Sequence, residues 1–230
     1  MREFTISVDT LEKGQYEEVI TVKQVIVVGY GGRDIEKVEE HIAELAEIGV
    51  APPETIPAIY PQDVSSINLG DKIDVEGKET SGEAEYVLFH NGEEWLVTLG
   101  SDHTDRFLET KDILKSKQAC PKPLADVFWR LEDIKDHWDE LYLRSWIKDE
   151  KGKRKYQEDS LHSLLPVETL LEKLKEFGYR DLSNTVIFSG TVPTLEGFVY
   201  GEKFQYELAD AKLNRRIESA YCIKVMEGQK

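Results

Sequence analysis

The 230-residue sequence has little cysteine, no long apolar run and few basic residues relative to acidic ones. Its two cysteines, Cys120 and Cys222, form no CxxC pair, so neither a disulfide framework nor a cysteine-based zinc site is expected. Apolar runs such as residues 25–28 are far below the about 18 residues that suggest a membrane span, and residues 1–4 open no secretory signal. We therefore expect two reduced thiols in a soluble, cytoplasmic protein.

Basic side chains are outnumbered: 29 lysines and arginines stand against 45 aspartates and glutamates, so the formal net charge is −16. This charge repels phosphate backbones and anionic lipid headgroups, so we expect neither nucleic acid nor a membrane as a partner. The sequence is 40% hydrophobic and 10% aromatic, which suits a packed core. Because no repeat or linker divides it, we expect one domain, with N-terminal strands and a helix in residues 1–60 and a β core in residues 61–230.

The hydropathy pattern predicts a mostly β protein with a few helices. One helix is predicted at residues 35–48 after the N-cap residue Asp34, and another at residues 166–177, ended by Gly178. Prolines between residues 52 and 61 predict an ordered loop. Strands are expected at residues 4–8, 19–28, 185–188, 203–208 and 217–225, and a hairpin at residues 141–156.

A further hairpin is predicted where Asn91-Gly92 separates residues 83–89 from residues 94–99, because Asn-Gly is the strongest short hairpin signal. If these two residues form the turn, the register is fixed and one face of the hairpin is apolar.

The opposite face of that hairpin is acidic. The same register places Glu83 opposite Gly100, Glu85 opposite Thr98, and Asp102 diagonal to Glu83. Carboxylates so close together repel unless a cation neutralises them or one holds a proton, and an all-oxygen set suits Mg²⁺, Mn²⁺ or Ca²⁺ rather than zinc. The alternative is a solvent-facing acidic surface, which spacing alone favours in so acidic a chain.

Two segments that carry these carboxylates resemble the metal-binding core of the fumarylacetoacetase superfamily. They are residues 81–87 (SGEAEYV) and 100–106 (GSDHTDR). Members carry a Glu-x-Glu strand followed by an Asn-Asp-x-Ser-x-Arg turn. The resemblance implies that Glu83, Glu85 and Asp102 bind a divalent cation, with Mg²⁺ the first expectation and Mn²⁺ or Ca²⁺ the alternatives.

Two downstream segments extend the resemblance. Residues 116–123 (SKQACPKP) are similar to the segment whose lysine reaches the substrate, which implies that role for Lys117, or for Lys115 in a shifted alignment. Residues 189–191 (SGT) resemble the Thr-Gly-Thr-Pro loop that receives a substrate carboxylate on a backbone amide and a hydroxyl. The substrate-binding residues implied in this way are Thr191, Gly190, Arg106, Tyr60 and Gln62.

Some positions depart from the pattern of the better-characterised members. Those members have lysine where the Tyr60-Pro61-Gln62 stretch stands, and proline directly after the Gly-Thr pair where this chain has Val192. The closest likeness, through residues 41–45, 100–106 and 116–123, is to a bacterial and fungal branch of the superfamily.

His41 and Glu44 lie three residues apart on the first predicted helix, so their side chains can touch. Helical spacing places His41 at the border of the apolar stripe, and spacing alone favours a partly exposed histidine without a catalytic role. The superfamily carries a His-x-x-Glu dyad on a helix or lid that closes over the metal. This resemblance implies that Glu44 orients the imidazole and that His41 transfers protons.

The resemblance covers residues 25–225 and implies an α+β, mostly β fold. This fold is a fumarylacetoacetase C-terminal-domain-like mixed β-sandwich or β-roll with a few helices, in a homodimer. It implies a metal-dependent hydrolase or lyase that acts on a small acidic metabolite, a 2-oxo acid or 1,3-dicarbonyl acid, through a metal-stabilised enolate. Hydrolytic C–C cleavage is the first expectation. Decarboxylation, dehydration, hydration and tautomerisation stay open, as does a non-catalytic module that binds a metal and a small acid.

The remaining titratable residues have no spacing typical of a site. We expect Asp105 to hold Arg106 in place, with a fourth metal-ligand role as the alternative. The glycine-rich residues 29–32 lack the third glycine of a dinucleotide loop and predict a turn. Structural roles are expected for His90, His103, His137 and His162.

Overall fold

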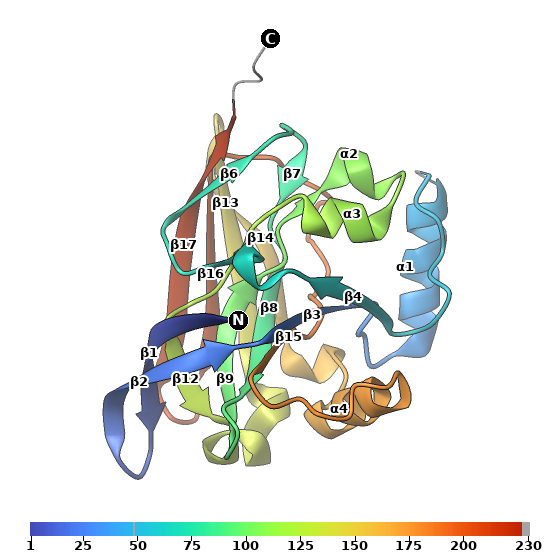
Figure 1. Ribbon diagram of the computed structural model, residues 1–230. Helices are drawn as coiled ribbons and strands as arrows, with labels where there is room; N and C mark the ends of the chain where they lie inside the picture. Colours follow the sequence, from blue (N-terminus) through green and yellow to red (C-terminus); the bar gives the residue numbers. More distant parts are fainter. Residues whose placement is uncertain (48, 227–230) are drawn as a thin grey trace.

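The computed structural model describes residues 1–47 and 49–226 and has two main β-sheets (Figure 1). In spatial order the eight-stranded sheet contains β2 (Gly14–Val22), β1 (Arg2–Thr10), β12 (Val127–Arg130), β9 (Trp95–Ser101), β8 (Ala84–His90), β15 (Thr185–Phe188), β3 (Gln24–Gly29) and β4 (Ala58–Gln62). The five-stranded sheet contains β14 (Gly152–Ser160), β13 (Tyr142–Asp149), β16 (Lys203–Asp210), β17 (Arg215–Val225) and β6 (Lys72–Val75). Two short pairs join β7 (Thr80–Ser81) to β10 (Thr104–Asp105) and β5 (Ile67–Asn68) to β11 (Lys122–Pro123). Parallel and antiparallel pairs both occur, so the sheets are mixed, as predicted.

Helices lie around the sheets, and α1 stands at one side of the molecule near α2 and α3 (Figure 1). The α-helices are α1 (Ile35–Glu47), α2 (Arg106–Glu109), α3 (Ile113–Gln118) and α4 (Val167–Glu176). Short 3₁₀ turns occur at η1 (Val64–Ser66), η2 (Leu131–Asp133), η3 (Lys135–Glu140) and η4 (Leu161–Ser163). The prediction of a mostly β fold with a few helices is confirmed. Among the described residues, every helix is too short or too polar to cross a membrane.

Apolar side chains cover both faces of the eight-stranded sheet. One cluster fills the space between the two sheets and includes Tyr86, Leu88, Leu99, Leu143, Leu208 and, from α4, Leu170 and Leu174. The second cluster lies on the opposite face and includes Phe4, Val25, Val27, Val87, Phe89, Phe128 and Phe188. Because successive strand residues point to opposite faces, β8 contributes to both clusters. Both faces of β8 are covered, so its charged residue Glu85 is buried.

One sequence prediction is wrong in detail. The proline-rich passage contains a strand, β4, in addition to a loop. Pro61 is tolerated there because β4 is at the edge of the sheet, where the missing N–H breaks no ladder. The predicted helix at residues 35–48 is confirmed as far as Glu47, and its last residue lies outside the described part of the chain.

The hairpin of β8 and β9 has a different turn from the one predicted. Residues 91–94 form the loop, because the Asn91 side chain accepts hydrogen bonds from two backbone amides within it. Glu85 therefore pairs with Gly100 rather than with Thr98. A shift of two residues returns every side chain to the same face, so the predicted acidic face survives the wrong register.

Candidate metal centre and active site

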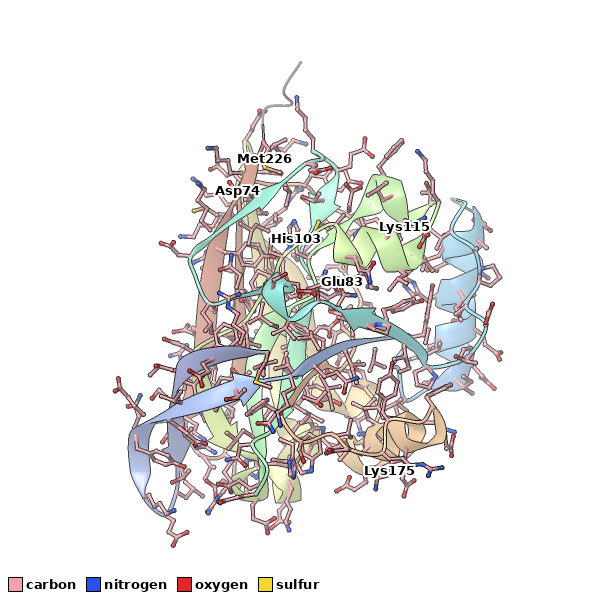
Figure 2. All side chains as sticks on the ribbon, in the orientation of Figure 1. Asp74, Glu83, His103, Lys115, Lys175 and Met226 are labelled. Atoms are coloured by element: carbon pink, nitrogen blue, oxygen red, sulfur yellow. The ribbon has the colours of Figure 1, made fainter. Side chains whose placement is uncertain are left out.

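A cavity of about 510 Å³ lies between α1, the loop at residues 29–34, η4 and the loop at residues 190–193. The carboxylate-bearing residues Glu83 and Glu85 contribute to its lining, together with Lys117. Figure 2 shows Glu83 in the interior of the molecule, close to α2 and α3. Apolar side chains line the cavity as well, so it is a pocket with an acidic end and a partly apolar wall.

Three carboxylates converge at the acidic end. Glu83 directly precedes β8, Glu85 lies within β8, and Asp102 directly follows β9. The antiparallel ladder holds them together, and the Asp102 amide continues it by donating to the Glu83 carbonyl at 3.0 Å. One oxygen from each side chain lies within 4.8 Å of the others. Glu85 and Asp102 are almost completely buried. The acidic face is therefore an internal cluster, and the solvent-facing alternative is wrong.

The chemistry and spacing of this cluster suit a hard divalent cation. All the donors are carboxylate oxygens, which Mg²⁺ and Ca²⁺ prefer and which are unusual as a complete set for zinc. Octahedral ligands of Mg²⁺ at about 2.1 Å lie about 3.0 Å apart when adjacent and about 4.2 Å apart when opposite. The limit of 4.8 Å between the oxygens is close to this range. Glu83, Glu85 and Asp102 are thus the residues that would hold the ion.

Lys117 is the cation nearest to these carboxylates. Its ammonium group contacts Asp102 and lies 3.5 Å from Glu83 Oε2. Burial lowers the pKa of Lys117, but the charges of Asp102 and Glu83 outweigh burial and raise this pKa above its ordinary value. Lys115, in contrast, is 75% exposed and pairs with Asp112 at 3.0 Å. Of the two lysines that the sequence left open, the structure brings Lys117 to the cluster.

The three carboxylates have different environments. Burial raises the pKa of Asp102, but Lys117 and Lys122 outweigh burial and hold it at about 2. The pKa of Glu83 is also lowered, because Arg106 and Lys117 together outweigh its burial. Glu85 is the exception, since burial and then the charges of Asp102 and Glu83 raise its pKa well above the ordinary value. Glu85 is therefore the carboxylate whose charge the neighbouring cations compensate least, and a bound divalent ion would stabilise its ionised form.

Arg106 lies behind Glu83 and is absent from the cavity lining. Its guanidinium group lies 2.9 Å from Glu83 Oε1 and donates to both carboxylate oxygens of Glu109, at 2.9 and 3.1 Å. The Phe198 ring stacks on it, 4.1 Å from the guanidinium carbon to the ring centre. Asp105 accepts a hydrogen bond from the Leu108 amide and caps α2. The expectation that Asp105 holds Arg106 is wrong, because Glu83 and Glu109 do so.

Two charged residues of the site, Glu109 and Lys122, were not predicted from the sequence. Glu109 lines the cavity, and its only sequence signal is the i, i+3 spacing from Arg106 on a short helix. Lys122 is fully buried, with Nζ 2.9 Å from Asp102 Oδ1. The same ammonium group donates to the backbone carbonyls of His103, at 2.7 Å, and of Lys117. Lys122 belongs to the SKQACPKP segment, but nothing in that spacing indicates that it turns inward.

The His41 and Glu44 side chains meet on α1, with Nδ1 of the histidine 3.5 Å from Oε2 of the glutamate. Both are largely exposed, at 58% and 76% of their side chains. His41 lines the cavity beside Val38 and Leu45, whereas Glu44 is absent from the lining. The histidine therefore faces the same space as the acidic cluster, and the glutamate contacts it from outside.

The Gly-Thr loop lines the cavity with its polar groups already engaged. The Gly190 amide donates to Glu85 Oε2 at 3.0 Å. The Thr191 hydroxyl donates to the Ala84 carbonyl at 2.7 Å and accepts from the Gln157 amide group at 2.7 Å. In this structure the amide and the hydroxyl serve to fix the loop against β8.

The two remaining residues implied by the resemblance differ in position. Tyr60 lines the cavity, and Lys117 Nζ lies 5.7 Å from the centre of its ring. Gln62 is buried away from the cavity, and its side-chain amide donates to the Tyr60 carbonyl at 3.2 Å. Tyr30, which the sequence analysis assigned only to a turn, also lines the cavity, with a positive φ of 58°.

The mixed sheets have the fold of the fumarylacetoacetate hydrolase superfamily, as the sequence indicated. Similar solved structures include a 2-keto-3-deoxyarabinonate dehydratase, with a TM-score of 0.65 and 16% identity over 92% of this chain and 78% of that one. A fumarylacetoacetate hydrolase family protein from yeast has a TM-score of 0.62 and 15% identity over 91% of this chain and 96% of that one. Within this fold, the chain belongs to the family described as "Protein of unknown function (DUF2848)", whose model matches residues 28–221. No curated protein matches the chain.

Proposed function

We propose that the protein is a divalent-metal-dependent enzyme that acts on a small 2-oxo acid or 1,3-dicarbonyl acid through an enolate. Hydrolytic C–C cleavage is the first reaction to test. The observation that carries the proposal is a cluster of three carboxylates within 4.8 Å of one another, two of which, Glu83 and Glu85, line a cavity that His41 also lines. A structural ion alone would need no such cavity beside it.

The ligands of the ion in this proposal are Glu83, Glu85 and Asp102, with Mg²⁺ as the first choice and Mn²⁺ or Ca²⁺ as alternatives. When bound, such an ion withdraws electrons from neighbouring substrate oxygens and stabilises the negative charge of an enolate. The fold supports this choice, since a 2-keto-3-deoxy-D-arabinonate dehydratase of similar structure is described as complexed with magnesium and 2,5-dioxopentanoate.

The other polar residues of the cavity have separate roles in the proposal. His41, oriented by Glu44, removes a proton from water or from a substrate carbon. The ammonium group of Lys117 carries a permanent positive charge and stabilises negative charge as it develops on the substrate. Because Gly190 and Thr191 hold the loop against β8, a substrate carboxylate would have to displace their present hydrogen bonds.

Dehydration is the second candidate reaction, and the observation that favours it is the similarity to the dehydratase structures. Dehydration and C–C hydrolysis both pass through an enolate, so the residues named above serve both. Decarboxylation, hydration and tautomerisation also involve an enolate and stay open. A binding module without turnover is the proposal from a different class, and it requires a ligand that stays unchanged. The homodimer and the cytoplasmic location stay predictions.

The experiment measures turnover of a panel of 2-oxo acids and acylpyruvates with Mg²⁺ or Mn²⁺, and again after removal of metal by a chelator. Metal-dependent turnover of any member supports the enzyme and identifies the reaction. Tight binding of a panel member with no product in any reaction would instead support the binding module.

A further inference from the structure

A second histidine, His162, lines the same cavity as His41. It lies in η4, which hydrogen bonds fix against the glycine-rich loop at residues 29–34. The Arg33 amide donates to the Ser163 carbonyl at 2.9 Å, and the Leu165 amide donates to the Gly31 carbonyl at 2.9 Å. The position of this histidine is thus determined by the backbone on both sides of the cavity wall.

Arg33 and Asp139 form a bidentate ion pair beside His162. The guanidinium group donates to both oxygens of Asp139, at 2.6 and 2.8 Å, and its Nε donates to the Leu164 carbonyl at 3.0 Å. Hydrogen bonds from Arg33 and then from His162 lower the pKa of Asp139 to about 2. Asp139 is therefore charged across the neutral range, and an arginine holds its orientation.

This pair satisfies one ring nitrogen of His162 in either protonation state. Nδ1 lies 3.0 Å from Asp139 Oδ2 and also 3.0 Å from Arg33 Nη1. A carboxylate only accepts and a guanidinium only donates, so Nδ1 bonds to Asp139 when it carries a proton and to Arg33 when it does not. Among the hydrogen bonds of the described residues, none involves Nε2 of His162. Nε2 is thus free to exchange a proton, whichever state Nδ1 adopts.

We propose that His162 is a second catalytic residue of this cavity and transfers a proton through Nε2, with Asp139 and Arg33 as positioning residues. The inference rests on the proposed function, because it assigns a step of that reaction. C–C hydrolysis removes a proton at one atom and returns a proton at another. Two histidines at different positions in the cavity can serve these two transfers separately.

The substrate of this reaction is a 1,3-dicarbonyl acid. His41 takes a proton from water while the water oxygen bonds to the distal carbonyl carbon. The C–C bond then breaks, and its electron pair passes to the enolate fragment. Protonated His162 gives its Nε2 proton to the enolate carbon and becomes neutral. Exchange with solvent afterwards removes the proton from His41 and restores the proton of His162, so the net reaction consumes one water.

The test compares His162→Asn, His162→Ala and wild type on two probes in the presence of Mg²⁺. One probe is the exchange of pyruvate methyl protons for deuterium, followed by NMR, and the other is the cleavage of acetopyruvate. Asparagine keeps a side-chain N–H near Asp139 but has no group that titrates. Both variants should lose about 10²-fold or more in kcat for both probes. Their thermal unfolding and Mg²⁺ affinity should match the wild type, as should activity in His90→Asn, a histidine outside the cavity.

The outcomes separate the inference from the proposed function. Wild-type rates in His162→Asn would show that the reaction needs no titrating group at this position and would overturn the inference alone. A wild-type protein that binds no Mg²⁺ and acts on neither probe would overturn both. Asp139→Asn adds a further check, because the loss of a positioning residue should lower kcat and leave KM unchanged.

Discussion

Lys122 Nζ lies 2.9 Å from Asp102 Oδ1, and both side chains are completely buried. This contact joins the segment after α3 to the residue that follows β9, and it fixes the carboxylate that contacts Lys117 through its other oxygen. Burial removes water from both charges, and the attraction between them offsets this cost. The pair therefore stabilises the fold only while both partners are present.

Replacing Lys122 should therefore destabilise the protein strongly. We expect Lys122→Met to lower the free energy of unfolding by about 3 kcal/mol or more, because Asp102 is left buried and without this partner. Denaturant unfolding measures the change. Lys115→Met, which removes an exposed lysine of α3, is the matched control and should change stability by less than about 0.5 kcal/mol. Equal stability of the two variants would show that the buried contact contributes nothing.

Glu85→Gln should remove metal binding without loss of the fold. Glutamine keeps an acceptor for the Gly190 amide but cannot ionise, so it removes one of the three carboxylates. Because the pKa of Glu85 is raised by burial and by like charges, its ionised form destabilises the metal-free protein at neutral pH. We expect Glu85→Gln to have a higher melting temperature than metal-free wild type and to show no Mg²⁺ binding by calorimetry. Unchanged Mg²⁺ binding would remove Glu85 from the ligand set.

The Arg33–Asp139 pair gives a dependence of stability on pH. The folded pKa of Asp139, about 2, is below its unfolded value, so its stabilising contribution is present above about pH 4 and is lost as the pH falls toward 2. Asp139 is about half exposed, so we expect this contribution to the free energy of unfolding to be less than about 1 kcal/mol. Wild type should be more stable than Asp139→Asn at pH 7, and the difference should disappear near pH 2. A difference independent of pH would contradict this assignment.

Both members of the α1 dyad should matter for turnover and not for metal binding. His41→Ala should lower kcat by about 10²-fold or more, since general acid–base groups contribute at that level. Glu44→Ala should cause a smaller loss, because this residue acts only through His41. Acetopyruvate cleavage measures the rates, and calorimetry should show unchanged Mg²⁺ affinity. Glu40→Gln, an exposed residue on the same helix, is the control. Full activity in His41→Ala would exclude the helix from the reaction.

The sequence predicts those parts of the site that depend on local spacing. The carboxylates share a face because strand residues alternate, and this held even though the Asn91 side chain made the turn longer than the Asn-Gly pair suggests. His41 and Glu44 meet because residues three apart on a helix are neighbours.

The parts that the sequence does not predict depend on tertiary contacts. Lys122 faces inward because three acceptors surround its ammonium group, two from the adjacent residues Asp102 and His103 and one from Lys117. Arg33 and His162 are 129 residues apart, so neither spacing nor composition indicates that they meet. The positions of Arg106 and Gln62 outside the cavity follow from packing in the same way.

The most direct test of the account is a crystal structure of the protein with Mn²⁺, because the anomalous signal identifies the ion. The account predicts a peak coordinated by oxygens of Glu83, Glu85 and Asp102 at about 2.2 Å, beside the cavity that His41 lines. Crystals saturated with Mn²⁺ that show no peak among these three carboxylates would contradict it.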